Sequence, residues 1–184
     1  LYQVATADLS PAEIAWPIRS MFSKSPNVSV FMGEVTGIDL PNQRVLSGEH
    51  VLEYDYLVLA TGAVTSYFGN DDWASVAPGL KNITEATNIR KSLLMAFERA
   101  ENSQDEDQKR RLLNFIVVGG GPTGVEMAGA IAELAKKTLS DDFRRIDPRD
   151  ARIILAEGGP RLLAAFPEDL SDYTQKSLES IGVE

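Results

Sequence analysis

A glycine-rich stretch contains the residues whose types and spacing most directly indicate chemistry. Gly119, Gly120, Gly121, Pro122, Thr123 and Gly124 follow one another and satisfy the pattern G-x-G-x-x-G. In this pattern the first glycine permits a tight turn, the second lets a diphosphate approach the backbone, and the third lets a helix pack closely on a sheet. The pattern is weakly specific by itself, so it predicts a dinucleotide site only where a strand precedes it and a helix follows.

Glu157 is the candidate acidic partner of this loop. It directly follows the apolar run at 153–156, which predicts a second strand. A carboxylate at that position accepts hydrogen bonds from the adenosine ribose and repels a 2′-phosphate, so Glu157 favours NADH over NADPH. Its distance from the loop exceeds the usual ~20 residues, and the charged segment 140–150 accounts for the excess. Arg161 could soften the exclusion of NADPH, and an ordinary exposed acid is the alternative for Glu157.

Glu126 is the second acid of interest, two residues after Gly124. We expect it in the first turn of the following helix, where the helix dipole stabilises a carboxylate. Two interpretations are open. One places Glu126 beside the nicotinamide at the point of hydride transfer, and the other makes it an ordinary acid of a helix start.

Hydrophobic periodicity predicts the elements that must position these residues. Residues 115–118 predict a strand, and the pattern after the glycines predicts an amphipathic helix over 125–139. Gly182 is placed to terminate a last helix. The apolar face of that last helix consists of Leu170, Tyr173, Leu178 and Ile181. Another helix is predicted before the first strand, and its apolar face consists of Ala86, Ile89, Leu93, Phe97 and Ala100.

The first part of the chain follows a different pattern. Ser-Pro-Ala-Glu at 10–13 is a helix-start signature, because the serine caps free N–H groups and the glutamate can reach back to the cap. From Val28 the apolar residues alternate, and turn pairs at 41–42 and 47–48 predict a small antiparallel meander. The run 56–60 is apolar throughout, which predicts a strand buried on both faces.

Composition excludes several classes of function. The chain has 184 residues and a net charge of −9, which argues against a nucleic-acid surface. It has no cysteine and one histidine, so we expect no disulfide, no thiol chemistry and no metal site. No stretch of about 20 apolar residues could span a bilayer. The chain begins with Leu1 and shows no signal peptide, and we expect both ends to lie within a longer polypeptide.

Three segments carry a resemblance to a known family. "YDYLVLATGA" at 54–63, "FIVVGGGPTGVEMAG" at 115–129 and "FRRIDPRDARIILAEGGPRLL" at 143–163 resemble the two-dinucleotide flavoproteins, and within them the type II NADH:quinone oxidoreductases. The resemblance implies an α/β fold, the FAD/NAD(P)-binding Rossmann-like three-layer fold, here incomplete and with a small antiparallel β-meander. It also implies part of an FAD-binding domain at 1–82, a connecting helix at 83–112 and the first part of an NADH-binding domain at 113–184.

The resemblance implies two cofactors, FAD and NADH, and a transfer of hydride from NADH to FAD followed by reduction of a membrane quinone. Glu126 matches the acid near the nicotinamide, and Val35 matches the residue whose backbone contacts the FAD adenine. Ala60, Thr61 and Gly62 match the residues beside the flavin. Because the first glycine loop of the family is missing from this sequence, we expect the chain alone to bind FAD poorly and to lack quinone reductase activity.

The resemblance further implies a peripheral protein on the cytoplasmic face of the bacterial inner membrane, attached through segments outside this chain, and leaves a homodimer open. Two other functions stay open. One is a related flavin enzyme with a soluble protein acceptor, of the ferredoxin or nitrite reductase type, and the other is a non-catalytic NADH-binding module. The segment 145–148, Arg-Ile-Asp-Pro, and the lack of cysteine favour the quinone-reducing branch.

Overall fold

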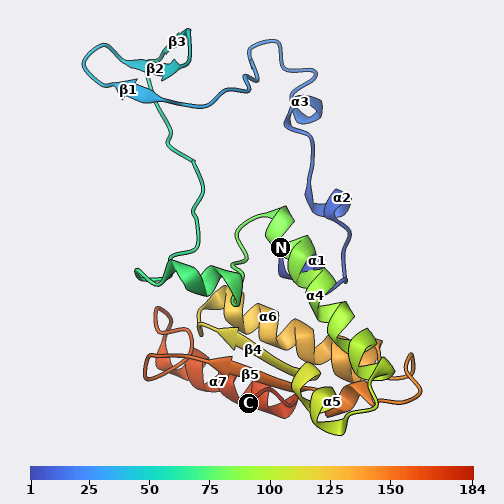
Figure 1. Cartoon of the computed structure of the whole chain (residues 1–184). Helices are drawn as coiled ribbons and strands as arrows, with labels where there is room; N and C mark the ends of the chain where they lie inside the picture. The colour runs from blue at the N-terminus through green and yellow to red at the C-terminus, as the bar shows by residue number, and fades with distance from the viewer. The chain divides into compact units, whose positions relative to one another are not determined.

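The computed structural model describes all 184 residues, which form two compact units. The larger unit contains Leu1–Ile14 and Thr65–Glu184, and the smaller unit is Ala15–Val64. Figure 1 labels their elements.

A parallel sheet is the centre of the larger unit. Strand β4, Asn114–Val118, pairs in parallel with β5, Arg152–Ala156, so that Phe115 lies opposite Ile153. Both predicted strands are confirmed. Val183, just beyond the last helix, forms a further parallel bridge with Ile153 on the other side of β5.

Helices α4, Ile83–Asn102, and α6, Pro122–Glu133, each contribute four buried apolar residues to the core. Asn82 caps α4 by accepting a hydrogen bond from the amide of Glu85 at 2.9 Å. The expected apolar face of α4 is confirmed, since Leu93 and Phe97 are buried with Ala86 and Ala100. The remaining helical elements of this unit are α1 (Tyr2–Ala5), α2 (Pro11–Ile14), the 3₁₀ turn η1 (Asp71–Ser75), α5 (Glu106–Leu112), the π turn η2 (Leu134–Thr138), the 3₁₀ turn η3 (Pro148–Asp150) and α7 (Glu168–Ser180).

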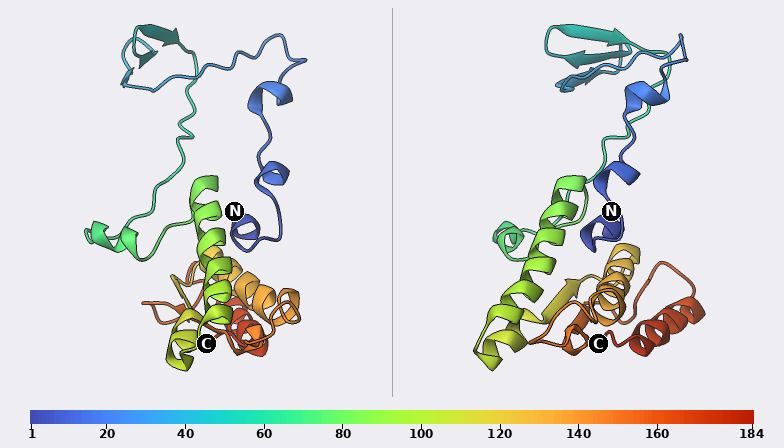
Figure 2. Two further views of the ribbon diagram at one scale, coloured as in Figure 1. Left: turned by 45° about the vertical axis from the view of Figure 1, so that its right-hand side comes forward. Right: turned by 90° about the vertical axis from the view of Figure 1, so that its right-hand side faces the viewer.

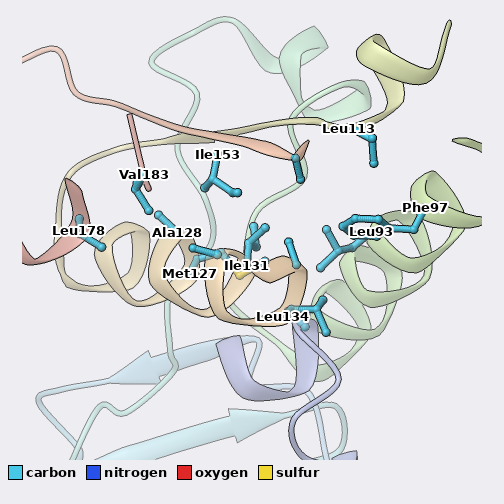
Figure 3. Close-up of a cluster of buried hydrophobic side chains, with 14 of the residues drawn as sticks. Leu93, Phe97, Leu113, Met127, Ala128, Ile131, Leu134, Ile153, Leu178 and Val183 are labelled. Carbon is cyan, nitrogen blue, oxygen red and sulfur yellow. The ribbon is translucent and has the colours of Figure 1, made fainter. Parts of the chain in front are cut away.

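The core joins helices to one face of the sheet (Figure 3). Ala128 of α6 and Ile153 of β5 are completely buried, and Phe97 of α4 packs against Phe115 of β4 with ring centroids 5.3 Å apart. Helix α1 packs on both α4 and α6, as the turned views in Figure 2 let the reader follow. The small side chain of Ala128 suits close packing of α6 on the sheet.

The other face of this sheet is exposed. Because side chains alternate along a strand, Ile116 and Val118 point away from the core, and they are 65% and 76% exposed. Within this chain, helices therefore cover the sheet on one face.

The charged segment before β5 is tied to the end of α4. The Glu101 carboxylate accepts hydrogen bonds from the backbone amides of Arg144, Arg145 and Ile146 at 3.2, 2.8 and 3.2 Å. These three N–H groups belong to the predicted excursion between the two strands. One side chain thus orders the turn that leads the chain into β5.

The helix-start signature near the N-terminus is confirmed in a short helix. Helix α2 follows Ser10, whose amide donates to the Glu13 carboxylate at 2.6 Å. No helix of either unit combines the length and the apolar character that crossing a bilayer requires.

The smaller unit contains an antiparallel sheet of three strands and the short helix α3, Ile18–Met21. Its strands are β1 (Gly37–Asp39), β2 (Arg44–Ser47) and β3 (His50–Glu53), paired in the order β1-β2-β3. The predicted meander is confirmed. The expectation that strand structure begins at Val28 is wrong, because residues 28–36 form no strand.

The buried strand predicted over 56–60 is also not present. The backbone there pairs with no other strand, and Tyr56 and Val58 are 95% and 84% exposed. A strand needs a neighbour to satisfy its N–H and C=O groups, and this chain provides none for these residues.

Candidate functional site

The glycine loop leaves the carboxyl end of β4. Gly119 continues the pairing with β5, because its amide donates to the carbonyl of Ala156 at 2.8 Å. Its φ of +106° lies where residues with a side chain are rarely found. A glycine is therefore needed at this turn, which reverses the chain directly after the strand.

Helix α6 begins earlier than the sequence predicts. We expected a loop over 119–124 and a helix from Val125, but the helix starts at Pro122, with Gly121 as its N-cap. Proline at the first helical position explains the difference, because its φ suits a helix and its missing N–H would have no partner there. The loop proper is therefore 119–121.

Gly124 lies where the helix passes closest to the loop. A Cβ added to Gly124 would overlap the backbone carbonyl oxygen of Gly119, and backbone cannot move aside as a flexible side chain can. At Gly121 a Cβ would meet nothing within 4 Å. The third glycine of the motif thus permits close packing, and the second has open space in front of it.

That open space faces the start of α6. Gly121, Pro122 and Thr123 are exposed. The first amides of a helix have no partner within the helix, and the positive end of its dipole attracts anions. Pro122 has no N–H, so the donors available to a phosphate come from its neighbours. The geometry fits a diphosphate at this helix start.

Glu157 faces this loop from the end of β5. Its Oε2 accepts a hydrogen bond from the amide of Gly120 at 2.5 Å, and its Oε1 accepts one from the amide of Gly159 at 2.6 Å. These amides, that of Gly120 above all, hold the pKa of Glu157 below its ordinary value. The carboxylate is ionised at neutral pH and lies at the same edge of the sheet as the glycines.

Gly120, the middle glycine of the loop, is held at both of its backbone groups. Its N–H donates to Glu157, and its carbonyl oxygen accepts a hydrogen bond from the amide of Leu163 at 2.7 Å. Gly120 is also buried. Its N–H is consequently occupied within the chain. Gly159 and Leu163 were not expected from the sequence, although the Gly-Gly-Pro at 158–160 directly after the acid was an available signal.

Glu126 lies on α6 with an exposed side chain. Its expected position in the first turn is wrong, because the helix starts four residues earlier, at Pro122. The influence of a helix dipole falls off beyond the first turn. The argument from the helix dipole therefore does not apply to Glu126 at its position in α6.

The candidate flavin residues all belong to the smaller unit. Val35, Ala60, Thr61 and Gly62 are exposed, and none lies in a strand. Gly62 has a φ of +75°, which a glycine adopts without strain. All four residues are open to solvent, so they do not by themselves enclose a flavin.

A cavity of the larger unit lies at the other end of the sheet. It has a volume of about 420 Å³ and is lined by Asn114 and Arg152, at the amino ends of β4 and β5, together with residues of α5 and of the Glu101-bound turn. This end of the sheet is opposite the glycine loop. Dinucleotides bind at the carboxyl ends of parallel strands, so the cavity is not the candidate site. No group of three or more His, Cys, Asp or Glu side chains could hold a metal ion.

The larger unit combines a parallel strand pair, a glycine turn at the start of a helix, and a carboxylate at the end of the next strand. Together these features define the dinucleotide-binding class of α/β proteins. Residues 1–184 match the family model described as pyridine nucleotide-disulphide oxidoreductase, and the chain belongs to this family. The expected fold class is thereby confirmed.

Two curated relatives show which proteins of this family the chain resembles. The chain is 48% identical to the type II NADH:quinone oxidoreductase Ndh of Mycobacterium tuberculosis, over all of this chain and 41% of that protein. It is 46% identical to NdhA of the same organism, over all of this chain and 40% of that protein. The chain therefore spans about two fifths of the length of these relatives.

Two solved structures also resemble this chain. NDH2 from Plasmodium falciparum in complex with NADH superposes with a TM-score of 0.82 at 27% identity, over all of this chain and 39% of that one. A ferredoxin reductase from Rhodopseudomonas palustris matches with a TM-score of 0.63 at 18% identity, and this likeness shows the fold alone.

Proposed function

We propose that this chain forms the NADH-binding part, and a portion of the FAD-binding part, of an NADH:quinone oxidoreductase. The observation that carries the proposal is the pairing of an ionised Glu157 with an open glycine turn at the carboxyl end of β4. The curated relatives named as type II NADH:quinone oxidoreductases support the reaction.

In the proposed site, the diphosphate of NADH lies against the amides at the start of α6. Gly121 leaves room for it, and Thr123 and Gly124 supply backbone donors. Glu157 accepts hydrogen bonds from the adenosine ribose hydroxyls. A 2′-phosphate would bring like charge to this carboxylate, so NADPH is disfavoured. Glu126, on the exposed side of α6, is proposed to lie near the nicotinamide.

The flavin assignment rests on family membership and on the resemblance of the 54–63 segment. We assign Val35, Ala60, Thr61 and Gly62 to FAD on that basis alone. FAD, where bound, supplies the hydride acceptor, and this chemistry belongs to the cofactor. The proposed domain bounds are 1–82 for the flavin part, 83–112 for the connecting helix and 113–184 for the NADH part.

The acceptor is proposed to be a membrane quinone. An external NADH-ubiquinone oxidoreductase of Yarrowia lipolytica is 38% identical over 94% of this chain, which supports a quinone rather than a soluble protein acceptor. We place the full-length protein at the cytoplasmic face of the bacterial inner membrane, with attachment through residues outside this chain and with a homodimer as its assembly.

The experiment is an anaerobic titration of the full-length protein with NADH while flavin absorbance is recorded. We expect NADH to bleach the flavin and a soluble quinone analogue to restore its absorbance. Oxidised ferredoxin, added in place of the quinone, should restore nothing. A protein without flavin absorbance, or one that NADH does not bleach, would contradict the proposal.

A further inference from the structure

Arg161 lies four residues beyond Glu157, and its guanidinium forms hydrogen bonds within the chain. One terminal nitrogen donates to the carbonyl of Phe166 and the other to the carbonyl of Ala164, both at 2.9 Å. Both acceptors belong to the same connection between β5 and α7, residues 157–167. Two of the five N–H groups of the guanidinium are used in this way, and both terminal nitrogens are directed at carbonyls of this connection.

These two hydrogen bonds hold a turn that is conformationally strained. Leu163 has a φ of +49°, in the left-handed region that a branched side chain rarely adopts. The amide of Phe166 donates to the carbonyl of Leu163 at 2.8 Å and closes the turn. Such a conformation persists only where the surroundings enforce it. Arg161 enforces it by binding carbonyls on the far side of Leu163.

The strained turn contacts the glycine loop directly. The amide of Leu163 donates to the carbonyl of Gly120 at 2.7 Å. The Leu162 side chain lies so close to Gly120 that a Cβ there would come within 2.6 Å of its Cδ2. On its other side the connection is anchored to α7, where the buried Ser171 donates to the carbonyl of Leu162 at 2.6 Å.

A path of contacts therefore runs from Arg161 to the nucleotide site. Arg161 holds the turn, the turn places the amide of Leu163, and that amide fixes Gly120. Gly120 in turn donates to Glu157. Each of these hydrogen bonds has a backbone group as donor or acceptor, so a shift of the turn is passed on to the loop and to the carboxylate.

We propose that Arg161 is a positioning residue of the NADH site that acts through Leu163 and Gly120, and that it is not a receptor for a 2′-phosphate. The inference rests on the proposed NADH site. It replaces the expectation that Arg161 softens the exclusion of NADPH. Discrimination between the two nucleotides then depends on Glu157, with no opposing cation supplied by this connection.

The test measures dissociation constants of NADH and NADPH for the full-length protein and for the variant Arg161→Ala. We expect both nucleotides to bind about tenfold more weakly, with their ratio unchanged. KM for NADH should rise with little change in kcat. Arg161→Lys should be intermediate, since an ammonium group cannot hold two carbonyls in the planar geometry of a guanidinium. A loss confined to NADPH would overturn the inference.

A rescue variant separates positioning from charge. Glycine adopts the conformation of Leu163 without strain, so Leu163→Gly combined with Arg161→Ala should regain part of the lost NADH affinity. A receptor cation could not be replaced in this way, so absence of rescue would overturn the inference. Arg144→Ala serves as the matched control, because the Arg144 side chain forms no hydrogen bond or ion pair and should leave both constants unchanged.

The proposed function can fail separately from this inference. An unsubstituted protein that binds neither nucleotide would overturn the proposed function and the inference together. An unsubstituted protein that binds NADH, with an Arg161→Ala variant that binds it equally well, would overturn the inference alone.

Discussion

Gly124 and Gly121 belong to the same motif but meet opposite surroundings. A Cβ at Gly124 would overlap the carbonyl oxygen of Gly119, whereas one at Gly121 would meet nothing. We expect Gly124→Ala to lower the free energy of unfolding of the larger unit by about 1–3 kcal/mol through overpacking. Denaturant unfolding of the variant measures this loss.

Gly129→Ala, in the same helix, is the matched control. A Cβ there would lie 3.6 Å from Leu178, an ordinary contact, so the change should stabilise the helix by about 0.5–1 kcal/mol. If both alanine variants have the same free energy of unfolding, the close approach at Gly124 does not affect stability.

Gly121→Ala should act on binding and not on folding. The φ of Gly121 is −76°, which alanine tolerates, so unfolding should be unchanged. The added methyl group would occupy the space in front of the helix start, and we expect the dissociation constant of NADH to rise about tenfold. Isothermal titration of the full-length variant checks this. Unchanged affinity would mean that the diphosphate does not approach the loop at Gly121.

The hydrogen bonds of Glu157 predict a dependence of stability on pH. Because the amides of Gly120 and Gly159 lower its pKa in the folded state, the carboxylate stabilises the fold above its unfolded-state pKa. This contribution is lost as the pH falls through the lowered folded-state pKa. The stability difference between the natural protein and Glu157→Gln should thus be largest near neutrality and shrink in acid, as urea unfolding at several pH values would reveal. A difference constant across pH would rule out this role.

The residues of the candidate site could largely be named from the sequence, because glycines and a strand-end acid carry local signals. Their mutual arrangement could not be predicted. Gly120 donates to Glu157 across 37 positions of chain, and Leu163 reaches Gly120 through a strained turn. Such contacts depend on where two strand ends meet in space, and no short-range pattern records that.

At the level of elements, the turn at 144–146 depends on α4. The Glu101 carboxylate binds three consecutive amides there. We expect Glu101→Ala to release this turn, because amides without an acceptor gain solvent partners when the turn opens. Trypsin should then cleave after Arg144 or Arg145 severalfold faster, as timed digestion and mass spectrometry would detect.

Glu98→Ala provides the comparison for this experiment. Glu98 is exposed on the same helix, and its side chain forms no hydrogen bond or ion pair. Its replacement should leave the cleavage rate at 144–145 unchanged. Equal cleavage of both variants would show that the carboxylate of Glu101 does not hold the turn.

The elements that the sequence predicts well are those stabilised within the chain. The apolar face of α4 and the strands β4 and β5 combine a clear period with a partner to pack on. The run 56–60 has equally apolar residues but no strand beside it, so its composition indicates burial that this chain does not supply. Hydrophobicity alone cannot report whether a pairing partner exists.

For the whole molecule, the core described here predicts where stability resides. Phe97 is completely buried between α4 and the sheet. We expect Phe97→Ala to cost about 3–5 kcal/mol of unfolding free energy. Hydrogen exchange followed by mass spectrometry should locate the loss in the larger unit and leave the amides of β1, β2 and β3 unaffected. Faster exchange in those strands would show instead that both units unfold together.

The two-sided hold on Gly120 limits how this chain can vary. Glu157 and Leu163 lie at the two ends of a short stretch of backbone, and each forms a hydrogen bond with Gly120. Because both ends of this stretch are bound to Gly120, the distance that it bridges is fixed. Inserting or deleting even one residue between 158 and 162 is therefore expected to displace the glycine loop. Substitutions that preserve length keep this span, and among them those at Arg161 are expected to disturb the turn that it holds. The number of residues between the two anchors is therefore expected to matter at every position of this stretch, whereas residue identity matters most at Arg161.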